Sequence, residues 1–122
     1  MAVNFEPIFP KSPVTSVARP AAANATLAEG NTNNVDLFVA GTDGSRVDEL
    51  GVYTQEVGVV VQFFYDDGAT ESLLTRSTPA IDTYTTVSIG TKAIQMPSGH
   101  KIRVGVSSVT NPTRAYAKGG HY

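Results

Sequence analysis

Turn-forming residues divide this chain into short segments, and no window of the sequence sustains the 3.6-residue period of an amphipathic helix. Asp-Gly pairs at 43–44 and 67–68 and a Pro-Ser-Gly turn at 97–99 separate segments rich in Val and Thr. Several short strands at such a spacing are typical of sandwiches and jelly rolls. We therefore predict an all-β fold, an antiparallel β-sandwich that is jelly-roll-like and has about eight or nine short strands.

Two of the predicted strands differ in how regularly they alternate. Residues 34–40 alternate plainly, with Val35, Leu37 and Val39 expected on one face. In the strand after the first Asp-Gly turn, Val47 is out of phase with Leu50 and Val52. A β-bulge near residues 48–49 would turn all three toward the core, and we predict one there.

Residues 57–65 are apolar on both faces of the expected strand. Such a strand is central in its sheet, or is covered by a loop or by another subunit. Val60 and Phe64 lie on the second face and are therefore candidate partner contacts. The first face is expected to consist of Val57, Val59, Val61, Phe63 and Tyr65.

The pair Asp66-Asp67 directly before Gly68 offers either a turn or a carboxylate site. Adjacent side chains point to opposite sides of an extended segment, and no further ligands follow at the spacing of an EF-hand. An Asp-Gly pair also accepts the positive φ of a tight hairpin. We predict a turn.

Residues 1–13 carry three prolines, which disfavour a central strand. We predict an extended N-terminal arm over residues 1–13 and a single β-sandwich domain over residues 14–122. Phe5, Ile8 and Phe9 are large apolar groups on this arm. They either fold back over their own core or anchor the arm on a neighbouring subunit, and so they are candidate partner contacts.

Composition excludes several classes of function. The net charge is −2, and nine Lys and Arg residues are scattered along the chain, so we expect no nucleic-acid partner. No apolar run approaches the ~20 residues of a membrane span, and the first residues lack the features of a signal peptide. We expect a soluble protein that does not bind membranes. Because cysteine is absent, disulfides, thiolate zinc sites and cysteine nucleophiles are excluded.

No constellation of residues indicates catalysis. His100 and His121 are isolated in the sequence and are expected to be solvated. No nucleophile elbow, P-loop, zinc-protease or dinucleotide motif is present. We predict that the protein is not an enzyme and has no catalytic residue, cofactor or metal. The basic side chains of the expected strands are interpreted as a solvated face; they are Arg46, Arg76, Lys101, Arg103, Arg114 and Lys118.

The order and spacing of four segments resemble a set of small tailed-bacteriophage virion proteins of the capsid decoration or cement type. The segments are LFVAGTDGSRVDELGV, VVVQFFYDDGATESLL, MPSGHKIRVGVSS and RAYAKGGHY, within residues 34–122. The chain departs from the shared pattern at its end, where GGHY stands and an acid is common. The residues that match look like turn-formers: Gly41, Gly44, Ser45, Asp67, Gly68, Pro97, Gly99, Gly119 and Gly120.

The resemblance implies a structural virion protein that binds the outside of the phage head as an oligomer and stabilises contacts between shell subunits. It implies the major capsid protein as partner and a homotrimer as the oligomer. The location it implies is the capsid exterior of the virion, after assembly in the host cytoplasm.

Two other functions remain open. One is a neck, tail or fibre-base component of the virion, with the same fold and fewer copies. The other is a carbohydrate-binding β-sandwich module for host attachment. Tyr53, Tyr84 and Tyr116 could form the aromatic platform of such a module, although the absence of Trp counts against it.

Overall fold

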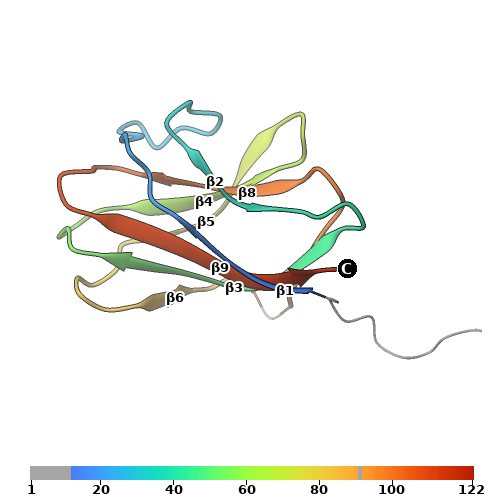
Figure 1. The fold of residues 1–122 in the computed structure, drawn as a ribbon. Coiled ribbons are helices and arrows are strands. Elements are labelled where there is room, and N and C mark those ends of the chain that lie inside the picture. Colours follow the sequence, from blue (N-terminus) through green and yellow to red (C-terminus); the bar gives the residue numbers. More distant parts are fainter. Residues whose placement is uncertain (1–11, 91) are drawn as a thin grey trace, which may run out of the picture.

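The computed structural model describes residues 12–90 and 92–122, which form nine β-strands and no helix. The strands build two antiparallel sheets that pack face to face (Figure 1). The prediction of an antiparallel β-sandwich is confirmed. No helix of the described chain is long and apolar enough to cross a lipid bilayer. The strands are β1 (Ser12–Ala18), β2 (Val35–Val39), β3 (Ser45–Thr54), β4 (Val61–Asp66), β5 (Glu71–Ser77), β6 (Thr85–Val87), β7 (Ile94–Met96), β8 (Lys101–Val106) and β9 (Thr113–His121).

The strand pairs are nested one inside the next. The strand β4 pairs with β5, β3 with β6, β2 with β8 and β1 with β9, all antiparallel. This long folded ribbon gives one sheet the order β1-β9-β3-β6 and the other the order β2-β8-β4-β5. The short strand β7 pairs with β3 beyond β6. Nested pairs wrapped into two sheets give the jelly-roll-like arrangement that the sequence predicts.

The predicted bulge in β3 is confirmed. Val47 pairs with Gly119 and Glu49 pairs with Lys118, so Asp48 has no register partner. The extra residue restores the phase, and Val47, Leu50 and Val52 are all fully buried. They join a core between the two sheets whose other fully buried members include Val61, Phe63, Ile102, Val104, Val106 and Ala117.

A second irregularity, in β2, overturns the predicted alternation there. The register of β2 against β8 shifts between Asp36 and Phe38. Phe38 therefore turns into the core and is 1% exposed, whereas Val39 is 48% exposed. The strand expected over residues 57–65 is also shorter than predicted. It begins at Val61, and Val57 lies in a turn with 81% of its surface exposed.

The first strand begins slightly earlier than the domain boundary predicted at residue 14. Ser12 and Pro13 already pair with His121 and Gly120 of β9. A proline is tolerated here because β1 is the edge strand of its sheet.

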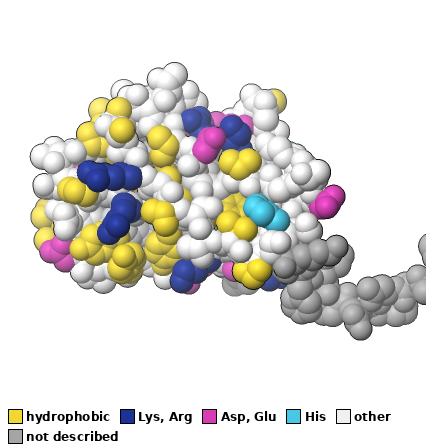
Figure 2. Space-filling view, in the orientation of Figure 1, with side chains coloured by type: hydrophobic (Ala, Val, Ile, Leu, Met, Phe, Trp, Pro, Cys, Tyr) yellow, Lys and Arg dark blue, Asp and Glu magenta, His cyan; other side chains and the backbone are white. Residues whose placement is uncertain are grey.

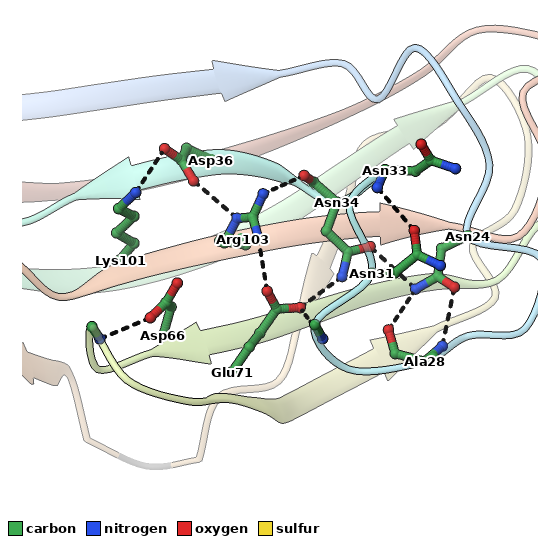
Figure 3. A network of polar contacts seen from close by, with 12 residues as sticks. Asn24, Ala28, Asn31, Asn33, Asn34, Asp36, Asp66, Glu71, Lys101 and Arg103 are labelled. Atoms are coloured by element: carbon green, nitrogen blue, oxygen red, sulfur yellow. Dashed lines mark hydrogen bonds and ion pairs between the residues drawn. The ribbon is translucent and has the colours of Figure 1, made fainter.

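Phe64 does not form the surface contact predicted for it, because its side chain is completely buried. It points away from the core, since Phe63 and Val61 face inward. The connection between β1 and β2, residues 19–34, covers this outer face, as Figure 3 shows. Asn24 and Asn34 of the connection lie over Gly105 of the neighbouring strand β8. Cover by a loop is therefore the reason that β4 is apolar on both sides.

We predict that Phe64→Ala destabilises the fold by about 3–5 kcal/mol, as expected for an aromatic side chain removed from a buried site. Urea unfolding followed by circular dichroism would measure the change. Leu73→Ala is the matched control, because Leu73 is the register partner of Phe64 on β5 and is 37% exposed. Its cost should be about 1 kcal/mol or less. Equal effects of the two substitutions would contradict a buried structural role for Phe64.

Candidate functional site

The residues predicted to contact partners are placed as follows. Phe5, Ile8 and Phe9 lie outside the described residues. Val60 is half-buried just before β4, where its N–H donates to Ser107 Oγ at 2.9 Å. Phe64 is buried, and its register partner Arg103 is bonded to Asn34 of the connection of residues 19–34. The two candidates that the structure describes, Val60 and Phe64, therefore do not form an exposed contact surface.

The outer face of the β2-β8-β4-β5 sheet is closed by a polar network (Figure 3). Glu71 is at its centre, with a side chain 5% exposed. Its carboxylate accepts hydrogen bonds from Asn34 Nδ2 at 2.6 Å, Gly30 N at 3.1 Å and Arg103 Nη1 at 2.9 Å. Arg103 also donates to the carbonyl of Asn34. The network therefore ties the connection to β5 and β8.

The outer end of this network reaches solvent. Arg103 Nε lies 2.9 Å from Asp36 Oδ1, and Lys101 Nζ lies 3.2 Å from Asp36 Oδ2. Among the basic residues considered in the sequence, Arg46 lies 2.9 Å from Asp48 and Lys118 lies 3.6 Å from Glu49. Carboxylates therefore lie beside Arg46, Lys101, Arg103 and Lys118, which does not favour one uncompensated basic patch.

The two histidines are bonded to other side chains, which corrects the expectation that both are merely solvated. His121 Nδ1 lies 2.5 Å from Ser45 Oγ, and His100 Nδ1 lies 2.6 Å from Tyr65 Oη. Ser45 is fully buried and also accepts a hydrogen bond from Gly41 N. Its hydroxyl therefore holds β9 in place and is shielded from any substrate in solution.

The Asp-Asp-Gly sequence forms the predicted turn between β4 and β5. Gly68 has φ +93°, and its N–H donates to Asp66 Oδ1 at 2.8 Å. The backbone N–H groups of Thr70 and Ala69 donate to Asp67 Oδ1, and these bonds lower the pKa of the Asp67 carboxyl. Burial raises the pKa of the Tyr65 hydroxyl, and the nearby Asp67 carboxylate raises it further. In the described chain, no group of three His, Cys, Asp or Glu side chains is placed to hold a metal ion.

The outer face of the other sheet carries three tyrosines that come from distant parts of the chain. The rings of Tyr53 and Tyr84 lie 4.9 Å apart, and those of Tyr84 and Tyr116 lie 6.2 Å apart, measured between centroids. These are the three tyrosines considered as a platform from the sequence. We call this surface the tyrosine face and define it as Tyr53, Tyr84 and Tyr116 with Val17, Arg114 and Lys118.

Two local features build the tyrosine face. Gly51 is the register partner of Tyr116, and a Cβ at Gly51 would lie 2.0 Å from the Tyr116 ring. The absence of a side chain at Gly51 therefore lets the ring lie against the sheet. The connection before β6 is anchored by Asp82, whose N–H donates to the carbonyl of Thr54 at 2.9 Å. This bond holds Tyr84 beside the end of β3.

The polar groups around the tyrosine face carry both signs of charge. The guanidinium of Arg114 lies 5.4 Å from the ring centroid of Tyr53, and Lys118 Nζ lies 5.5 Å from that of Tyr116. The carboxylate of Asp82 accepts from the Tyr53 hydroxyl at 3.4 Å. Figure 2 shows hydrophobic side chains beside Lys and Arg on one side of the molecule.

A shallow hollow of about 330 Å³ lies within the tyrosine face. Tyr84 and Val17 are its most exposed apolar groups, at 66% and 63%. The hollow is lined by Thr15, Val17, Tyr84, Tyr116 and Lys118. Exposed aromatic and apolar groups with polar neighbours are typical of binding surfaces.

No protein-family model matches the chain, and a comparison with curated proteins also gives no match. Inferences about function therefore rest on the geometry described above and on the resemblance in the sequence.

We predict that Glu71→Gln destabilises the protein by about 1–3 kcal/mol, because it removes the buried carboxylate that accepts hydrogen bonds from Asn34, Gly30 and Arg103. Glu49→Gln is the matched control. It removes a carboxylate from a pair whose side chains are 36% and 59% exposed, and such pairs contribute about 1 kcal/mol or less. Thermal unfolding would compare the two variants. A loss for Glu71→Gln no greater than that for Glu49→Gln would show that the network does not hold the connection.

Proposed function

We propose that this protein is a structural virion protein that decorates the phage head, bound to the outside of the major capsid protein as a homotrimer. The resemblance over residues 34–122 supports the class of protein. The observation that carries the assembly role is the open edge of β1. This strand pairs with β9 on one side, and no described strand pairs with its other side.

Beyond Pro13, the open edge of β1 lacks the usual protection against pairing. Sheet edges are commonly blocked by charged side chains, bulges or a covering loop. Residues 14–18, with the sequence VTSVA, carry no charge, and no bulge interrupts their register with β9. An extended segment of another subunit can add to such an edge through backbone hydrogen bonds. The arm predicted over residues 1–13 leads directly into this strand.

The proposed mechanism is mechanical. A trimer clamps neighbouring shell subunits and buries surface across the joints between them. Specific interfaces of this kind bury about 1,600 Å² in total, and repeated binding sites add avidity. The apolar groups Phe5, Ile8 and Phe9 extend the contact of β1 onto a neighbour or onto the shell.

The copy number of this chain in purified particles tests the proposal directly. We expect copies comparable to those of the major shell protein, measured by quantitative mass spectrometry. A handful of copies per particle would instead support the neck, tail or fibre-base alternative. Absence from particles would overturn the assignment to the virion.

We predict that removal of residues 1–11 abolishes binding to particles and leaves the domain folded, because β1 begins at Ser12 and keeps its pairing with β9. Co-sedimentation with undecorated heads measures binding, and thermal unfolding measures the fold. The control is the full chain with Val109→Ser, which alters an apolar side chain that is 40% exposed outside β1 and should bind normally. Undiminished binding by the truncated protein would exclude the proposed role of the arm.

A further inference from the structure

The tyrosine face lies away from the point where the described chain begins. Ser12 pairs with His121, whereas Val17 pairs with Tyr116. The five residue steps between Ser12 and Val17 span about 17 Å along the strand. A partner that pairs with the backbone edge of β1 leaves the rings of Tyr84 and Tyr116 accessible. The inference about this face is tested by sugar binding to the isolated chain, which does not depend on binding to the shell.

The tyrosine face offers a ligand an organised aromatic surface. Tyr84 is 66% exposed, yet its ring contacts the rings of both Tyr53 and Tyr116. The Asp82–Thr54 hydrogen bond holds the backbone beside it. Tyrosine side chains supply rigid, amphipathic contact area at a low entropic cost. The ring of Tyr84 is therefore arranged for contact with a flat apolar surface of a ligand.

Hydrogen-bonding groups of both kinds surround this aromatic surface. Lys118 and Thr15 line the hollow beside Val17. Asp82 contributes a carboxylate beside Tyr53, and Glu49 contributes another beside Lys118. A ligand with an apolar ring face and hydroxyl groups around its edge matches this arrangement. A pyranose has these properties, because its C–H groups form one apolar face and its hydroxyls both donate and accept hydrogen bonds.

Size and charge favour a sugar over a macromolecular surface. The hollow of about 330 Å³ is at the lower end of the range for small-ligand sites. A stable protein contact would need about 800 Å² on each partner. Lys118 is paired with Glu49, and Asp82 places a second carboxylate beside Tyr53, which does not favour a polyphosphate as the ligand.

We propose that the tyrosine face binds a neutral oligosaccharide, with the apolar face of one sugar ring stacked on Tyr84 in the hollow between Val17 and Tyr116. Lys118 and Thr15 bind hydroxyls of that ring. The neighbouring carboxylate of Asp82 accepts a hydrogen bond from the adjoining sugar.

Binding can be measured on the isolated full chain with maltohexaose, cellohexaose and the hexamer of N-acetylglucosamine, by calorimetry and by tyrosine fluorescence. The chain has no Trp and five Tyr, so fluorescence reports on tyrosines alone. We expect at least one of these sugars to bind. Tyr84→Ala should weaken its binding by about tenfold or more, as truncation of a central aromatic contact does. Tyr84→Phe keeps the ring and should retain most of the affinity.

Tyr122→Ala is the matched control, because it removes a tyrosine near Gly44 and Gln95, outside the tyrosine face. Its affinity for the sugar should be unchanged, and thermal unfolding should show that each variant is folded. Failure of all three sugars to bind would overturn the proposal, as would equal binding by wild type and Tyr84→Ala. Binding of polygalacturonate alone would also overturn it and would assign the face to acidic polymers. None of these outcomes changes the copy number expected in particles.

Discussion

The buried ion pair between Glu71 and Arg103 connects most of the features on one side of the sandwich. Removing two charges from water is costly unless further hydrogen bonds satisfy them. Here Asn34 and the backbone of Gly30 supply those bonds to Glu71. Both groups belong to the connection between β1 and β2, so the Glu71 carboxylate is fully hydrogen-bonded only when this connection lies against the sheet. The same arrangement covers Phe64. The hydrogen bonds to Glu71 and the burial of Phe64 therefore stabilise the same conformation of the connection.

Because the connection covers only one sheet, the two outer faces of the sandwich differ in how much of them is accessible to other molecules. The β2-β8-β4-β5 sheet carries a covering loop, whereas the β1-β9-β3-β6 sheet exposes Tyr84 and Val17. The β1-β9-β3-β6 sheet also ends in the edge strand β1, which carries no charge over residues 14–18. An accessible edge and an accessible aromatic face on one sheet suit a protein that makes contacts with other molecules. The proposed subunit contact uses the backbone edge of β1, whereas the proposed sugar site uses side chains on the outer face of the same sheet.

Features set by local periodicity could be predicted from the sequence. The bulge in β3 followed from the phase of Val47 against Leu50 and Val52, because a fault in a two-residue repeat is visible without tertiary information. The Asp-Asp-Gly turn was predictable for the same reason, since its chemistry lies within a few residues. The bulge in β2 gave no such signal. Val39 is as apolar as Phe38, and only the register with β8 decides which of them faces inward.

The surroundings of the candidate site depend on pairings between distant residues. The sequence named Tyr53, Tyr84 and Tyr116 as possible partners, but their proximity arises from the pairing of β3 with both β6 and β9. The covering of the β2-β8-β4-β5 sheet was not predictable either, because the Asn-rich composition of residues 19–34 is that of an ordinary loop. Glu71 is separated from Asn34 and Arg103 by more than thirty residues in each direction. A buried glutamate paired across that separation leaves no periodic signature in the sequence.

The nested order of the strands also sets the sequence in which the fold can form. The strand β9 lies between β1 and β3, although it comes last of the nine along the chain. On a translating ribosome, β1 and β3 therefore emerge long before the strand that joins them. The β4-β5 hairpin is the most local pair and can form first, with the outer pairs closing around it. Non-local pairings of this kind fold slowly, on scales of about milliseconds to seconds. The side of β1 that later pairs with β9 therefore remains unpaired until the end of synthesis.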